Sequence, residues 1–182
     1  SMVESLNLEP AEPADQTSAR RPFVRFGRQD RHRTIWAPFF AEDYSGFIPY
    51  VFKNAGYEFQ VLPRPDRESV ELGLQYASND ICYPGTLVIG DIIKALKHRH
   101  YNAADIAIGI TQTGGQCRAS NYLALIRKAM IRAGFDDIPV ISVAASQGLV
   151  DQPGFDIQWL KKAGMLFVST MYADSIAKMY YI

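Results

Sequence analysis

The sequence predicts an α/β domain in which an open sheet of about four parallel strands carries helices on both faces. Short apolar segments alternate along the chain with longer segments that have helical features, and this alternation is typical of parallel sheets. One of the apolar segments has no polar face, as expected of a strand that helices cover on both sides. The predicted architecture is therefore a three-layer sandwich of the flavodoxin-like or Rossmann-like kind.

Four segments are expected to form the strands, because each is short, apolar and bounded by polar or turn-forming residues. They are residues 34–40, 57–62, 105–110 and 138–143. Residues 57–62 alternate between apolar and polar side chains, whereas residues 105–110 are almost continuously apolar.

Helices are expected between these strands and after the last one. Asp43 is a residue type that caps helix N-termini, and Gly56 and Gly134 suit helix C-termini. Pro84 suits the first turn of a helix. The expected helices, the last of them amphipathic, are residues 44–54, 67–77, 84–98, 120–133 and about 156 to the end.

The chain is expected to hold one folded domain. Residues 1 to about 30 have no hydrophobic periodicity and are rich in Pro, Glu, Arg, Asp and Ser, so they predict a disordered tail or linker. Residues 31–182 then form a single α/β domain with enough apolar content for one core. The chain ends in an apparently helical segment without a Gly or Pro stop signal, which suggests a fragment of a larger multidomain protein.

The composition argues against several classes of function. The 19 basic and 19 acidic residues cancel, so nothing indicates binding to nucleic acid or to an anionic membrane surface. The sequence has no apolar stretch of membrane-spanning length and no secretory signal pattern. Two widely separated cysteines do not form the disulfide framework of a small secreted protein. We therefore expect a cytoplasmic protein.

The two cysteines are the most informative residues. Cys82 comes just before the predicted helix at residues 84–98, and Cys117 lies between the third predicted strand and the next helix. The helix after Cys82 leads into the start of the third strand, so a right-handed crossover places its own start at the carboxyl edge of the sheet. Cys117 follows the third strand directly. Both cysteines are therefore expected at the crevice where open α/β sheets bind their ligands.

The residues around Cys117 suit either a metal site or an anion site. Backbone N–H groups at a helix start stabilise a thiolate, which is the form of cysteine that binds metals. Gly114 and Gly115 allow a cofactor to approach the backbone closely, and Arg118 adds positive charge. The same segment could instead bind phosphate or a nucleotide, although neither the P-loop pattern nor GxGxxG is present. A third alternative is a scaffold or docking domain with inert thiols that dimerises through the C-terminal helix.

Other polar residues are weaker candidates. Glu42 and Asp43 follow the first predicted strand and could act as acid or base, but helix capping explains Asp43 more simply. His98 and His100 lie near the end of their helix, at the edge of the sheet opposite Cys82. Ligation of one metal by these residues and Cys82 is therefore not expected.

The segments around the two cysteines resemble the acyl-CoA dehydratase activase-related proteins, which are described as CoA-substrate-specific enzyme activases. Members of this family join actin-like or Hsp70-like ATPase domains to a region similar to the subunits of 2-hydroxyacyl-CoA dehydratases and benzoyl-CoA reductases. The resemblance extends from about residue 34 to the end. Its specific segments are residues 79–91 (NDICYPGTLVIGD) and 111–122 (TQTGGQCRASNY), followed by 126–129 (IRKA) and 138–142 (IPVIS).

The resemblance implies an iron–sulfur function. In such systems ATP hydrolysis drives a low-potential electron through iron–sulfur clusters, and dehydratase-type subunits hold a 4Fe–4S or a double-cubane cluster. By this resemblance Cys82 and Cys117 are cluster ligands, and Gly114, Gly115 and Arg118 form the loop around the cluster.

Two features depart from the pattern of the family. A cubane cluster takes about three or four cysteines, whereas this chain has two. Gln116 also stands where a smaller residue is expected. The missing ligands are expected from a partner chain or from the rest of a larger protein. No ATPase signature occurs in this chain, so the expected partners are ATPase domains of the same or another chain and an acyl-CoA enzyme.

Overall fold

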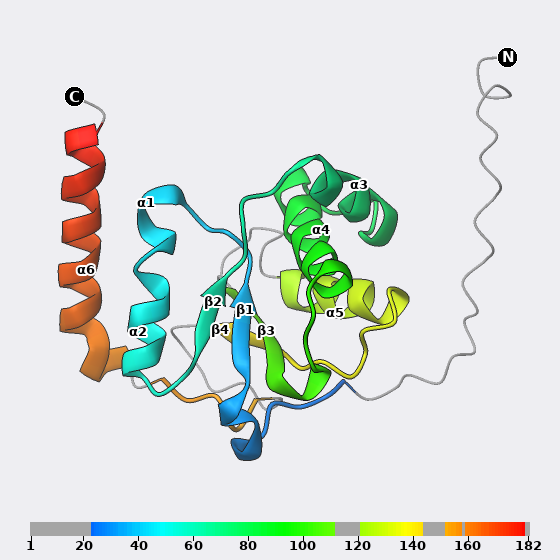
Figure 1. Ribbon diagram of the computed structural model, residues 1–182, viewed down its shortest axis with the longest axis horizontal. Helices are drawn as coiled ribbons and strands as arrows, with labels where there is room; N and C mark the ends of the chain where they lie inside the picture. Colours follow the sequence, from blue (N-terminus) through cyan, green and yellow to red (C-terminus); the bar gives the residue numbers. More distant parts are fainter. Residues whose placement is uncertain (1–22, 112–120, 144–151, 158, 181–182) are drawn as a thin grey trace, which may run out of the picture.

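The protein folds around one parallel sheet with helices on both faces (Figure 1). The computed structural model describes residues 23–111, 121–143, 152–157 and 159–180. In these residues the sheet has four strands in the order β2–β1–β3–β4, and every pair of neighbours is parallel. The predicted α/β class is confirmed, and the strand order is that of flavodoxin-like sheets.

The strands are short, and β3 and β4 are more fully buried than β1 and β2. Ile35 of β1 aligns with Phe59 of β2 on one side and with Ala107 of β3 on the other, while Gly109 of β3 aligns with Ile141 of β4. The strands are β1 (Thr34–Ala37), β2 (Phe59–Val61), β3 (Ile106–Thr111) and β4 (Val140–Val143).

The helices begin and end at residues with clear capping roles. Asp66 caps α3, because its carboxylate accepts the backbone N–H of Ser69 at 3.1 Å. Pro84 lies in the first turn of α4, and Gly134, with a φ of 81°, follows the end of α5. The α-helices are α1 (Glu42–Ser45), α2 (Ile48–Asn54), α3 (Arg67–Tyr76), α4 (Tyr83–His98), α5 (Tyr122–Arg132) and α6 (Trp159–Tyr180); the short 3-10 helices are η1 (Arg28–His32) and η2 (Ala103–Asp105).

The two faces of the sheet bury two separate apolar clusters, as the alternation of side chains along a strand requires. Trp36 and Ile108 lie in the cluster under α3, α4 and α5. Ile35 and Ile141 lie in the cluster on the opposite face, which α2 covers. Figure 1 shows these two layers of helices on either side of the strands.

Helices α3 and α4 touch each other through their backbones. A Cβ atom added at Gly90 of α4 would lie 1.7 Å from the carbonyl oxygen of Ser69, and one added at Gly73 of α3 would lie 2.2 Å from that of Thr86. Only glycine fits at such a crossing. This contact fixes the position of α4, the helix that carries Cys82 at its start.

The helix predicted at residues 44–54 is divided into α1 and α2. Pro49 lies in the first turn of α2, where its missing N–H is tolerated, so it marks a new helix start. Asp43 does not cap a helix, contrary to the prediction. It lies in the first turn of α1, whose N-cap is Ala41.

The packed part of the chain begins earlier than the predicted boundary near residue 30. Phe26 is 1% exposed and meets Phe155 edge-on, with 6.4 Å between ring centroids. Asp30 is buried and pairs with Arg33 at 2.7 Å. One buried aromatic ring in a polar segment leaves no periodic pattern, so the sequence could not indicate this packing.

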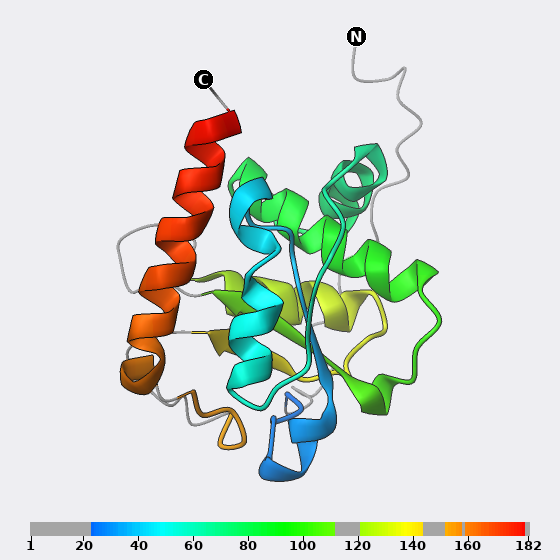
Figure 2. The same ribbon diagram turned by 60° about the vertical axis from the view of Figure 1, so that its left-hand side comes forward.

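Helix α6 lies on the outside of the molecule, against α1 and α2 (Figure 2). Ala173 is buried there, and the rings of Phe47 and Tyr172 meet edge-on at 6.1 Å. The amphipathic character predicted for this helix is absent, because apolar side chains are spread around its circumference. Within the described residues, no helix has both the length and the apolar character needed to cross a bilayer.

Candidate functional site at the carboxyl edge of the sheet

A large cavity opens at the carboxyl edge of the sheet. Its volume is about 610 Å³, within the range of small-molecule pockets. The last residues of all four strands line it, namely Ala37, Val61, Thr111 and Val143. The connections that leave β1 and β3 run to opposite sides of the sheet, and ligands of open α/β sheets bind at such switch points.

The wall of the cavity is almost entirely apolar. One side is formed by aromatic rings, among them Phe39, Phe52 and Phe59. The other side is one face of α4, since its lining residues have the helical spacing i, i+3, i+4, i+7: Pro84, Leu87, Val88 and Asp91. Asp91 is the only charged side chain among the described residues that line the cavity.

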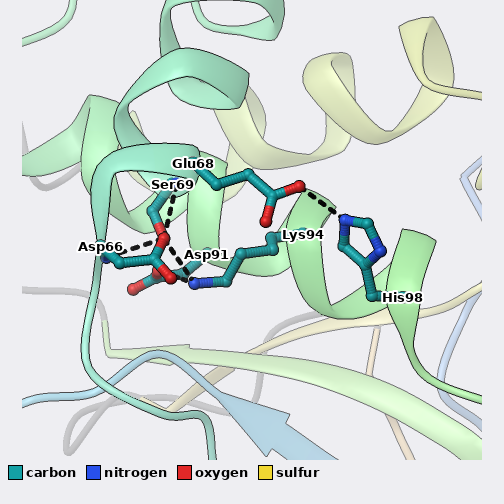
Figure 3. A network of polar contacts seen from close by, with 6 residues as sticks. All are labelled: Asp66, Glu68, Ser69, Asp91, Lys94 and His98. Atoms are coloured by element: carbon teal, nitrogen blue, oxygen red, sulfur yellow. Dashed lines mark hydrogen bonds and ion pairs between the residues drawn. The ribbon is translucent and has the colours of Figure 1, made fainter.

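Asp91 is 3% exposed, and within the described part of the chain its Oδ1 atom has no hydrogen-bond partner. The nearest cation is Lys94, whose Nζ lies 4.0 Å from that oxygen. Lys94 instead donates a hydrogen bond to Ser69 Oγ at 2.8 Å and pairs with Asp66 Oδ1 at 2.9 Å (Figure 3). Lys94 therefore binds mainly to the N-terminus of α3, and it balances the negative charge of Asp91 only weakly.

The carboxyl groups of Asp66 and Asp91 differ in pKa because Lys94 binds the first more closely than the second. Burial raises the pKa of Asp91, and Ser69 and Lys94 only partly oppose that rise. The hydrogen bond from Lys94, helped by the backbone N–H of Ser69, lowers the pKa of Asp66 to about 2. The cavity is therefore bordered by a carboxyl group that ionises less readily than usual.

Cys82 lies beside this cavity, at the N-cap of the 16-residue helix α4. Its carbonyl oxygen accepts the N–H of Thr86 at 3.1 Å, and its half-buried thiol makes no capping bond. The Sγ atom lies 3.0 Å from the hydroxyl oxygen of Tyr122, the first residue of α5 and part of the cavity wall. The starts of two helices therefore meet at the thiol.

The other predicted site residues lie outside the described residues. The described chain stops at Thr111, the last residue of β3, and resumes one residue before Tyr122. Both ends of the undescribed segment are therefore at the same edge of the sheet as Cys82. The predicted residues in that segment are Gly114, Gly115, Cys117 and Arg118.

The described residues include one cysteine and no complete metal site. Among them, no three Cys, His, Asp or Glu side chains come together in a group that could hold a metal ion. His98 pairs with Glu68 at 2.6 Å, at the opposite end of α4 from Cys82, so it cannot share a metal with that thiol. Glu42 forms an ion pair with Arg64.

The sequence analysis did not identify Asp91 as a site residue. A signal was present, because Asp91 is an acidic residue on an otherwise apolar helix face seven residues after Pro84. The cavity itself left no signal, since its aromatic wall combines residues from separate segments.

Comparisons of the chain with protein-family models, with curated proteins and with solved structures found no match.

Proposed function

We propose that the protein is a cytoplasmic domain that holds an iron–sulfur cluster in an ATP-dependent, activase-like and dehydratase-like electron-transfer system acting on acyl-CoA. Cys82 and Cys117 are the proposed ligands. The observation that supports this proposal is the contact between the Cys82 thiol and Tyr122. It joins the start of α4 to the end of the segment that carries Cys117.

The position of Cys82 suits a cluster ligand. Its thiol is half-buried, does not cap the helix, and lies 3.0 Å from the hydroxyl group of Tyr122, near the segment that carries Cys117. The positive end of the α4 helix dipole favours negative charge, which a thiolate-bound cluster carries. The apolar wall next to it would keep water away from the cluster.

Two cysteines do not complete a cubane, so the proposal includes ligands from a partner chain or from another part of a larger protein. A 4Fe–4S or double-cubane cluster would supply one-electron transfer at low potential. Gly114 and Gly115 would let the backbone approach the cluster, and Arg118 would balance its charge. The proposed partners are ATPase domains of the actin-like or Hsp70-like kind and an acyl-CoA enzyme, and a homodimer is also proposed.

The phosphate-binding alternative receives less support. The described residues that line the cavity include a carboxylate and no basic side chain, so they add nothing to the anion site expected at Gly114, Gly115 and Arg118. A scaffold with inert thiols is the other alternative. The test of iron and sulfide content distinguishes this scaffold from the proposed cluster-binding domain.

The test is the iron and sulfide content after anaerobic reconstitution, with dithiothreitol present to supply missing thiolates. The wild-type chain keeps two protein thiolates and needs only the remainder from dithiothreitol, so it is expected to retain both elements; Cys82→Ala and Cys117→Ala each keep one protein thiolate and are expected to lose most of them. Tyr122→Phe is the matched control, because it removes the hydroxyl next to the thiol and keeps the ligand. Iron in Cys82→Ala or in Cys117→Ala at the wild-type level would contradict the proposal.

A further inference from the structure

We propose that the cavity at the carboxyl edge binds a neutral, largely apolar organic molecule whose single hydrogen-bond donor is accepted by Oδ1 of Asp91. This goes beyond the proposed cluster and does not depend on it. The residues that carry the inference are in the described part of the chain.

The size and lining of the cavity indicate a small molecule with an apolar body. Its volume of about 610 Å³ is in the range of pockets that enclose small organic ligands. The rings of Phe52 and Phe59 stack at 4.0 Å between centroids on one side, and Leu87 and Val88 of α4 lie on the other. A flat or aliphatic group between them would bury its surface against apolar atoms.

Asp91 gives the cavity one polar contact. Most buried polar atoms in proteins have a hydrogen-bond partner, and one that lacks a partner requires an explanation. Oδ1 of Asp91 has none within the described residues, and the side chain lines the cavity. A ligand donor would supply the missing hydrogen bond.

The charges around Asp91 select a neutral donor. An anionic group would meet the carboxyl group, with no basic side chain among the described lining residues to offset it. An ammonium group would lie close to Lys94, whose Nζ is already 4.0 Å from the same oxygen. A hydroxyl group or a neutral N–H satisfies Oδ1 without either repulsion.

The test uses three ligands that share one ring system: 2-naphthol, 2-methoxynaphthalene and 2-naphthoate. Each is titrated into the full chain without added iron, and binding is followed by the NMR shifts of backbone amides. We expect saturable binding of 2-naphthol, with the largest shifts in α4. Loss of the donor in 2-methoxynaphthalene should weaken binding about tenfold, the usual effect of one hydrogen bond to a charged group. The anion 2-naphthoate should bind more weakly still.

Two variants and one control variant test whether the ligand binds in this cavity. Asp91→Leu removes the acceptor and should make 2-naphthol and 2-methoxynaphthalene bind equally. Val88→Phe places a larger side chain in the cavity one helical turn from Asp91 and should weaken binding, whereas Leu74→Phe adds the same ring at an exposed position of α3 and should not.

Three results would overturn the inference. They are no saturable binding of 2-naphthol to the wild type, equal affinity of the wild type for 2-naphthol and 2-methoxynaphthalene, and full binding in a folded Val88→Phe variant. The first and second need no variant, so the inference remains testable if a substitution prevents folding. Because no iron is added, these results are independent of the outcome for the cluster.

Discussion

At the scale of single residues, Asp91 is the most unusual side chain of the described structure. Its carboxyl group is buried at the wall of an apolar cavity, and Lys94 approaches it only to 4.0 Å. Burial of an incompletely paired charge costs free energy, and the pKa of Asp91 is raised because burial disfavours its ionised form. Residues with perturbed pKa in a pocket are frequent at functional sites.

This cost predicts how Asp91→Asn changes stability. A carboxyl group with a raised folded-state pKa penalises folding when it is ionised, so the penalty grows as the pH rises above 3.8 and through the folded-state pKa. The asparagine variant should therefore be more stable than the wild type at neutral pH, by about 1 kcal/mol. Well below pH 3.8 the gain should vanish, because Asp91 is then protonated in both the folded and the unfolded state.

Urea denaturation at the two pH values measures this difference. The low-pH measurement is made between 3.8 and the Asp66 pKa of about 2, near pH 3, where Asp91 is largely protonated in both states and the ion pair of Asp66 with Lys94 persists. An asparagine variant that is less stable than the wild type at neutral pH would mean that the ionised carboxylate is well compensated.

At the scale of elements, the crossing of α3 and α4 positions both Cys82 and Asp91. Gly90→Ala should destabilise the protein by about 1–3 kcal/mol, because the added Cβ would overlap the carbonyl oxygen of Ser69. Gly164→Ala is the matched control, since it also lies inside a helix and its added Cβ meets no atom within 4 Å. The control should gain up to about 1 kcal/mol from helix propensity.

Thermal unfolding of the two glycine variants gives the comparison. A Gly90→Ala variant as stable as Gly164→Ala would show that the two helices can separate without cost. The position of α4, and with it the geometry of the cavity, would then be less constrained than the close backbone contact implies.

At the scale of the whole molecule, the fold could be predicted from the sequence because its elements are strongly patterned. The almost continuously apolar segment at residues 105–110, the capped helix α3 and the helix α4 with proline in its first turn each carry several consistent signals. The division of α1 and α2 was not predicted, since Pro49 suits either a kinked helix or a new first turn. The burial of Phe26 was not predicted, because its partner Phe155 is more than a hundred residues away.

The candidate site was predicted only in part, for a similar reason. The position of Cys82 at the carboxyl edge follows from chain topology, which sequence patterns determine well. The cavity depends on side chains from four strands, the segments after them and several helices, so it appears only when they are assembled. Asp91 could be noticed in the sequence as an acid on an apolar helix face, but its unpaired oxygen could not.

The central claim, that Cys82 and Cys117 bind one cluster, is tested most directly by alkylation of the two thiols with iodoacetamide, followed by mass spectrometry. The chain is compared with and without anaerobic reconstitution with iron and sulfide. If both thiols are ligands, both should react in the iron-free protein, and both should be protected together after reconstitution. Protection of one of the two thiols without the other would contradict the claim.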